Sequence, residues 1–233
     1  MLFTWFVTFH ADHKPGAAAS EADRARFAQT VAATPQLAKA LLYTPAQAHD
    51  PYLHDGPPPM LAAQLYFPTI EALEAALGPA GHLQAIAGPG AFASLDGARA
   101  TQQALLVRRF PVPDAAFRTP KGQPHCTYLV AYEGAAQDLA AWNAHYIAHH
   151  PPIMARFPGI RQIEIYTRID WCGALPFERV DYMQRNKVVF DSQEALNAAL
   201  NSPVRHEMRA DFNKFPPFTG RNSHYPMATL QIA

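Results

Sequence analysis

The chain contains two copies of one unit, displaced by 123 residues. Residues 67–77 fall on residues 190–200 without a gap, and seven of these eleven pairs are identical. The same displacement aligns two further segments, 3–7 with 126–130 and 42–44 with 165–167. Alanine-rich helices produce chance matches, but one displacement shared by three segments does not arise that way. The sequence therefore predicts a tandem repeat, which limits the fold to two similar halves.

A proline-rich stretch separates the two copies. Residues 111–124 carry four prolines and little periodicity, which is typical of an extended connection. We therefore expect a first unit over residues 1–113, a linker over residues 114–124 and a second unit over residues 125–233.

Each copy shows strand-like and helix-like segments in the same order. In the second copy, residue content and apolar spacing predict strands at 126–132, 160–169, 182–190 and 225–232, helices at 139–156, 192–200 and 203–214, and a loop at 171–180. In the first copy they predict strands at 3–9, 38–44, 61–67 and 102–110, and helices at 20–34 and 69–77. The order β-α-β-β-α-β is that of the ferredoxin-like motif, so the predicted fold class is α+β.

A ferredoxin-like unit covers only one face of its sheet with helices. The other face must be buried, and two units in one chain achieve this by packing their bare faces together. We therefore expect a pseudo-dimer of the dimeric α/β-barrel type, with the ligand site in the cavity between the two sheets.

Composition excludes several classes of function. Lys plus Arg equals Asp plus Glu at 19 each, so no basic excess supports nucleic-acid binding or a polybasic membrane anchor. The apolar N-terminus lacks a basic region and a cleavage site and reads as a strand, and no apolar run approaches the ~20 residues of a membrane span. Two cysteines cannot build a disulfide framework. We expect a cytoplasmic protein with free thiols.

Histidines gather in the predicted helix at 139–156. His145 and His149 share a helix face, but metalloprotease-type sites also need a Glu between the histidines and a third ligand. No metal site is therefore predicted. His150 precedes Pro151 and Pro152, where we expect the helix to kink and the imidazole to face the cavity. A histidine there is a natural general acid or base.

The second copy resembles the EthD-like group of dimeric α/β-barrel proteins. The resemblance rests on His-Tyr, then His-x-Pro-Ile, then a basic residue with Pro-Gly, and a closing Asp-x-x-x-Phe-Pro, and it covers residues 126–233. It implies a bacterial protein linked to catabolism of organic compounds. The motif histidine falls on His150, the motif acid on Asp211 and the motif aromatic on Tyr146. Pro151 departs from the pattern and is expected to shorten the helix.

The repeat indicates a single asymmetric site. At the 123-residue displacement His150 falls on Phe27, and the other polar residues fall on unlike residues: Tyr146 on Asp23, Asp211 on Gly88 and His224 on Thr101. The first copy then serves as lid or wall. We expect His150, Asp211 and Tyr146 to be catalytic. The expected substrate-binding residues are Trp142, His145, Arg179 and His224, with Arg179 suited to a substrate carboxylate.

The leading hypothesis is a small-molecule enzyme that transfers protons as an isomerase, lyase or cyclase, without an organic cofactor, in catabolism of aromatic compounds or polyketide-type metabolism. Two alternatives stay open. One is a haem or metal oxidoreductase with His145, His149 or His150 as ligand. The other is a non-catalytic ligand-binding accessory module. With 49% apolar residues, we also expect a homodimer.

Overall fold

The computed structural model describes all residues except 12–15, 54 and 89. The elements of the first unit are β1 (Leu2–His10), α1 (Glu21–Ala32), β2 (Lys39–Pro45), β3 (Leu61–Phe67), α2 (Ile70–Leu77) and β4 (Arg99–Phe110), with short 3₁₀ turns at His82–Ile86 and Ala93–Leu95. Those of the second are β5 (His125–Tyr132), α3 (Leu139–Met154), β6 (Ile160–Arg168), β7 (Glu178–Arg179), β8 (Gln184–Phe190), α4 (Gln193–Leu200), α5 (Pro203–Phe212) and β9 (Asn222–Gln231). None of the described helices is long and apolar enough to cross a membrane.

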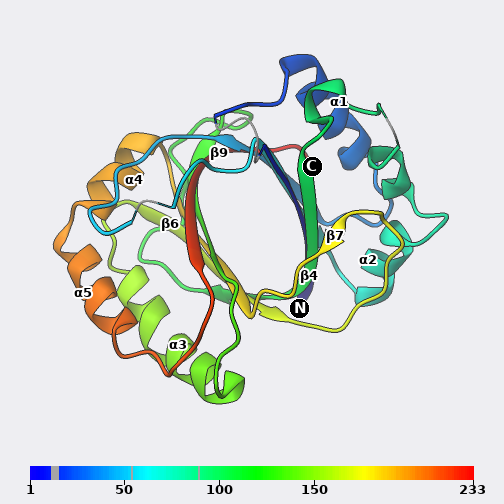
Figure 1. Cartoon of the computed structure of the whole chain (residues 1–233). Coiled ribbons are helices and arrows are strands. Elements are labelled where there is room, and N and C mark those ends of the chain that lie inside the picture. The colour runs from blue at the N-terminus through cyan, green and yellow to red at the C-terminus, as the bar shows by residue number, and fades with distance from the viewer. Residues whose placement is uncertain (12–15, 54, 89) are drawn as a thin grey trace.

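The strands form one sheet that closes on itself. Their order is β1-β3-β2-β9-β5-β8-β6-β4-β7, and β1 also pairs with β4. The pairs β2–β9 and β4–β6 join the two units at both seams, and all pairings around the closed barrel are antiparallel. Figure 1 looks along this barrel, with helices of the first unit on one side and those of the second on the other. The predicted pseudo-dimer of ferredoxin-like units is confirmed.

The repeat is visible in the element bounds. Adding 123 to the bounds of β3 gives those of β8, and adding 123 to the bounds of α2 gives those of α4. The caps repeat as well. Thr69 accepts a hydrogen bond from the Ala72 amide, and Ser192 accepts one from the Ala195 amide. Because both helices begin on the same kind of cap, local sequence fixes where each one starts.

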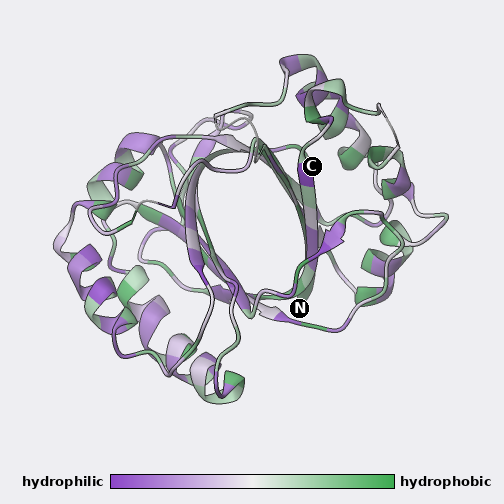
Figure 2. Cartoon of the chain, viewed as in Figure 1, coloured by the Kyte–Doolittle hydropathy of each residue, from purple (hydrophilic) through white to green (hydrophobic). Residues whose placement is uncertain are grey.

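Alternation along the strands divides the interior into three cores. In each unit, every second strand residue packs against that unit's own helices, as Trp5 and Val7 do in the first unit and Val188 and Phe190 in the second. The intervening residues point into the barrel, where Phe6 and Tyr166 belong to the third core. Figure 2 shows this alternation of polar and apolar residues along the strands.

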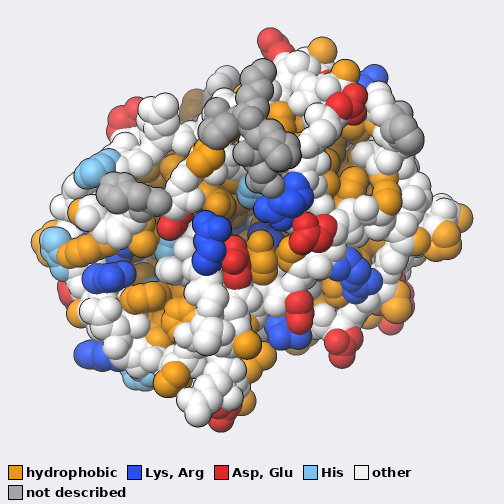
Figure 3. Space-filling view, viewed as in Figure 1, with side chains coloured by type: hydrophobic (Ala, Val, Ile, Leu, Met, Phe, Trp, Pro, Cys, Tyr) orange, Lys and Arg blue, Asp and Glu red, His pale blue; other side chains and the backbone are white. Residues whose placement is uncertain are grey.

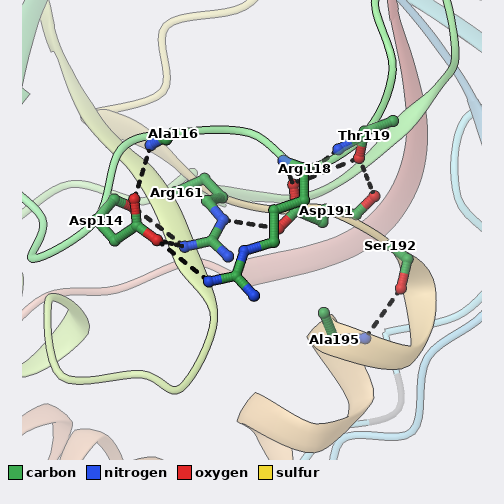
Figure 4. A network of polar contacts seen from close by, with 8 residues as sticks. All are labelled: Asp114, Ala116, Arg118, Thr119, Arg161, Asp191, Ser192 and Ala195. Carbon is green, nitrogen blue, oxygen red and sulfur yellow. Dashed lines mark hydrogen bonds and ion pairs between the residues drawn. The ribbon is translucent and has the colours of Figure 1, made fainter.

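The segment between the units is attached to the second unit by a polar network. The Arg161 guanidinium on β6 donates to Asp191 Oδ2 at 2.7 Å and to Asp114 Oδ2 at 2.8 Å. The amides of Arg118 and Thr119 donate to Asp191 Oδ1 (Figure 4). Residues 111–124 contain no helix or strand. These contacts hold the segment in one path although it lacks regular structure.

Two local features differ from expectation. The predicted loop at 171–180 contains the short strand β7, which pairs in parallel with β4 at Thr101 and Gln102. The sequence did not predict β7 because a strand of two residues is too short to show a periodic pattern of apolar residues. Pro151 was expected to shorten helix α3, but the helix continues through Pro151 and Pro152 to Met154, close to the expected end at residue 156. The two prolines remove two amide donors without stopping the helix.

Candidate functional site

A small cavity of about 50 Å³ lies in the second unit, between the outer face of the sheet and helices α3 and α5. Its walls are mostly aromatic and aliphatic, with a few polar groups. They include Tyr128, Tyr146, His150, Asn186, Phe212 and His224. A mainly apolar wall with few convergent polar groups is typical of a small-molecule site. Its volume is below the range of about 300–1,000 Å³ usual for ligand pockets, so a ligand requires the walls to open.

His150, which lines this cavity, forms a buried pair with Asp211. Nδ1 of His150 lies 2.7 Å from Asp211 Oδ2, and the two side chains come from α3 and α5. Burial lowers the pKa of His150, and the hydrogen bond to Asp211 offsets part of that effect. Burial has the largest effect and would raise the pKa of Asp211, but the hydrogen bond from His150 and the nearby imidazoles of His150, His145 and His149 together outweigh it, so that pKa is lowered. At neutral pH the pair is therefore a neutral imidazole that donates through Nδ1 to a carboxylate.

The free nitrogen of this imidazole is Nε2. Among the described residues none hydrogen-bonds to it, and His150 lines the cavity. A neutral histidine oriented by a carboxylate through Nδ1 is the standard arrangement of a general base. The position differs from expectation, however. His150 was expected in the cavity between the two sheets, and that was wrong. It lies on the helix-covered face, because α3 packs against the outer face of the sheet.

Tyr146 lies next to His150 and carries the third expected catalytic group. The two rings are 4.8 Å apart, and Trp142 stacks on the other side of Tyr146 at 5.1 Å. The Asn186 side-chain nitrogen donates to the Tyr146 hydroxyl at 2.8 Å. Burial holds the pKa of Tyr146 well above its usual value, so the hydroxyl stays protonated. Oδ1 of Asn186 is buried without a hydrogen-bond partner, which leaves an open acceptor at the wall.

The other two histidines of α3 lie at the edge of this group. Nε2 of His145 is 3.7 Å from Asp211 Oδ1, and its ring stacks on His149 at 4.4 Å. His149 is exposed, and its Nδ1 lies 2.8 Å from the carbonyl of His145. Among the described residues, no group of three His, Cys, Asp or Glu converges as metal ligands.

A loop of the first unit crosses over and covers the cavity. The loop carries residues 46–53, and the cyan trace near α4 in Figure 1 shows its path. Asp50 accepts two hydrogen bonds from Arg205 of α5, at 2.9 and 3.0 Å, and one from the Tyr128 hydroxyl at 3.0 Å. Leu53 of the same loop forms part of the cavity wall. The first unit thus supplies the cover of a site in the second.

His224 is held by Asp55, which follows this loop in the first unit. Asp55 Oδ2 accepts from the His224 amide at 2.8 Å and lies 3.0 Å from His224 Nδ1. The structure therefore brings His224 to the wall through a residue of the other unit. Sequence reasoning missed Asp50, Arg205 and Asp55 as parts of the site. The partners are 155 and 169 positions apart, and no periodic signal links them.

Arg179 does not belong to this site. It lies on β7, exposed, with its guanidinium carbon 3.7 Å from the centre of the Trp171 ring and a hydrogen bond to the Trp171 carbonyl. β7 pairs with β4 of the first unit, and Arg179 lines none of the described cavities. Six of the seven expected residues are thus close together, and the seventh is elsewhere.

The equivalent position in the first unit is filled with apolar side chains. Phe27 of α1 is fully buried, with Phe9 at 5.8 Å and Phe92 at 5.3 Å between ring centres. A phenyl ring here neither accepts nor donates a proton. The repeat thus carries a polar pair in one copy and a packed core in the other.

The comparisons with known proteins identify the fold. No protein-family model matches the chain, and no curated protein matches it. Among solved structures, an anthrone oxidase-like protein matches with a TM-score of 0.58 and 12% identity, covering 100% of this chain and 93% of that one. A proposed monooxygenase from Fusobacterium nucleatum matches with a TM-score of 0.53 and 8% identity, covering 98% and 91%. The chain thus has the dimeric α/β-barrel fold, with both halves in one polypeptide.

Two further solved structures are similar to the chain. An EthD family protein from Bacillus halodurans matches 42% of this chain and 96% of its own, with 20% identity and a TM-score of 0.34. Similarity at this level carries no argument about this chain. A chlorite dismutase from Candidatus Nitrospira defluvii matches with a TM-score of 0.51 and 13% identity, covering 97% and 91%.

The haem alternative can be tested against the cavity itself. His150 presents a free Nε2, which is the atom a histidine offers to a haem iron. However, the cavity beside it measures about 50 Å³, and the aromatic rings of Tyr146 and Phe215 lie within 5 Å of the His150 ring. A macrocycle does not fit beside His150 in this arrangement, and the walls would have to open much further for it than for a small aromatic ligand, so no step is derived through one.

Proposed function

We propose that the chain is a small-molecule enzyme that moves a proton on an apolar, enolisable substrate. The observation that supports the proposal is the buried His150–Asp211 pair at 2.7 Å on an aromatic wall. Burial lowers the pKa of His150, so the imidazole is a free base near neutral pH. A base of this kind accelerates proton transfer by about 10²–10⁴-fold.

The proposed step is proton abstraction from a carbon next to a carbonyl. Nε2 of His150 takes the proton, the C–H bond breaks, and its electron pair moves onto the carbonyl oxygen as an enolate. Asp211 stabilises the imidazolium that forms. In this proposal the protonated hydroxyl of Tyr146, which lines the cavity, donates to the enolate oxygen. Return of the proton to another carbon gives an isomerase, loss of a leaving group a lyase, and attack on an internal carbonyl a cyclase.

Two features support an aromatic substrate. Tyr128, Tyr132, Tyr146, Phe157 and Phe212 line the cavity, so a flat ring system is the shape that the wall favours. One structural neighbour is described as anthrone oxidase-like. An anthrone is a ketone whose ring C–H is acidic because its anion is a phenolate-type enolate. The first chemical step in the oxidation of an anthrone would be the proton abstraction proposed here.

The test is isotope exchange in D₂O. The protein is incubated with a panel of enolisable aromatic ketones and lactones, including anthrone and 2-tetralone, and loss of the acidic C–H signal is followed by NMR. We expect catalysed exchange with at least one compound and a loss of about 10²–10⁴-fold in H150Q.

The matched control is H149Q. His149 is one position away, but it is exposed and its ring contacts the backbone of its own helix. Exchange in H149Q should stay within a few-fold of the wild type. Equal exchange in H150Q and the wild type contradicts the proposal. Binding of a panel compound without exchange favours the accessory-module alternative.

We also propose that the chain forms a homodimer. The apolar share of 49% supports this. Among the described residues, the large hydrophobic side chains that are exposed are Met1, Tyr52 and Phe117. Light scattering should give twice the chain mass of 25.7 kDa at micromolar concentration, and the single-chain mass refutes the dimer.

A further inference from the structure

A second, larger cavity lies at one end of the barrel. It measures about 310 Å³, within the usual range for ligand pockets, and its walls come from strand residues that point into the barrel and from loop residues at its mouth. Phe6 and Thr8 of β1, Leu129 of β5, Arg185 of β8 and Tyr225 of β9 are among them. The larger cavity shares only Val130 and Asn186, both on strands of the sheet, with the cavity beside His150. Figure 3 shows charged side chains of both signs gathered near the middle of the face that looks along the barrel.

Arg185 is the unusual residue of this wall. Its side chain is 8% exposed, and no carboxylate among the described residues forms an ion pair with it. Its Nε donates to Gln103 Oε1 at 3.1 Å, and its guanidinium carbon lies 4.6 Å from the Tyr182 ring and 5.3 Å from the Phe6 ring. Arg, Lys, Asp and Glu side chains are almost never fully buried without a partner. A buried guanidinium that lines a cavity and has no ion-pair partner among the described residues can bind an anion there.

The guanidinium is held in position before any ligand arrives. Gln103 donates through its Nε2 to the Tyr182 carbonyl at 2.9 Å, which turns its Oε1 toward Arg185. Burial lowers the pKa of Arg185 to about 10, so it remains charged at neutral pH. The two terminal nitrogens of Arg185 make no hydrogen bond with a described residue. These are the atoms that bind a carboxylate as a planar fork.

The other Arg, Asp and Glu side chains of the wall balance one another, so the positive excess is the charge of Arg185. The Asp55 carboxylate already contacts His224 Nδ1, and Arg99 forms an ion pair with Glu178 at 3.2 Å. Glu133 and Arg221 also line the cavity and have opposite charges. The remaining surface is largely ring and aliphatic carbon, from Phe6, Tyr182, Tyr225 and Leu129.

We propose that this end of the barrel binds a small aromatic carboxylate, with the carboxylate on Arg185 and the ring between Phe6, Tyr182 and Tyr225. The site is separate from the His150 site and does not depend on its chemistry. An inorganic anion lacks the apolar body that these rings would contact, and a neutral aromatic lacks the charge. The proposal therefore requires both properties in one ligand.

The experiment uses benzoate as the probe, with benzamide as its neutral isostere and acetate as an anion without a ring. Binding to the full chain is measured by calorimetry, and the site is located from the NMR shift of the Arg185 Nε–H. We expect benzoate to bind and to shift that signal, with benzamide and acetate much weaker. In R185M, benzoate affinity should fall by about 10- to 150-fold, the worth of a charge-assisted hydrogen bond.

Two further measurements keep the test decisive. R156M removes an exposed arginine and should leave benzoate affinity unchanged. R185M should also unfold at the same or a higher denaturant concentration than the wild type, because it removes a buried charge without an ionic partner. If R185M fails to fold, the proposal is decided by comparing the affinities of the wild-type protein for benzoate and benzamide. Equal binding of the two, unchanged affinity in R185M, or NMR shifts at His150 in place of Arg185 overturns the proposal.

Discussion

The Asp50–Arg205 pair attaches the covering loop of the first unit to α5 of the second. Asp50 is 5% exposed and Arg205 is 8% exposed, and two hydrogen bonds of 2.9 and 3.0 Å join them. Removing one partner of a buried pair leaves the other without compensation and costs about 3–5 kcal/mol. We therefore expect D50A to favour opening of the loop by roughly 150- to 5,000-fold, since about 1.4 kcal/mol is tenfold.

Amide hydrogen exchange measures this opening directly. The amides of Gln47 and His49 donate to side chains of α4 and report contact of the loop with the second unit. Their exchange should accelerate in D50A by up to the factor above, while amides of the barrel strands stay protected. In the double variant D50A/R205M no buried charge of this pair is left without a partner, so most of the free-energy cost of D50A should disappear.

The control for this prediction is E207Q, which breaks the half-exposed Arg156–Glu207 pair beside α5. Such surface pairs are worth about 0–1 kcal/mol, so exchange should change less than about fivefold. If D50A resembles E207Q, or if exchange accelerates equally throughout the chain, the loop is not held by Asp50.

Two further predictions concern buried ionisable groups. Burial lowers the pKa of His150, so below pH 6.5 the unfolded chain binds more protons and stability falls as the pH is lowered. H150Q should therefore lose less stability than the wild type between pH 7 and 5 in urea titrations, and an unchanged loss contradicts this. Lys187 and Glu164 are buried inside the barrel and form an ion pair, with 3.3 Å between Nζ and Oε2. K187M should cost about 3–5 kcal/mol and K187M/E164L much less, and equal costs would show that the two charges are not coupled.

The strands were predictable because β-branched and aromatic residues are concentrated in them. In β1, every second side chain faces a core of helices and the rest face the barrel, so apolar content on both faces marks the strand. The 123-residue repeat then fixed the order of elements and the pairing of units. Glu178 and Arg179 of β7 carry no such signal, because a two-residue strand is set by its neighbour β4.

The candidate site was only partly predictable. His150, Tyr146 and Asp211 come together as the motif implies, because α3 and α5 of one unit carry all three. The face that they occupy was misjudged, since the bare sheet face was taken as the site. Asp50 and the barrel group of Lys187, Glu164 and Tyr66 depend on contacts between units, and Tyr66 and Lys187 are 121 positions apart. No local pattern encodes such a pairing.

The central claim is that His150 is a neutral base whose free nitrogen is Nε2. Two-dimensional ¹H–¹⁵N NMR of the imidazole, assigned with H150Q, reports which nitrogen carries the proton. At pH 7 we predict a single proton on Nδ1, in the hydrogen bond to Asp211, and an unprotonated Nε2. A proton on Nε2 at pH 7, alone or together with one on Nδ1, would contradict the account.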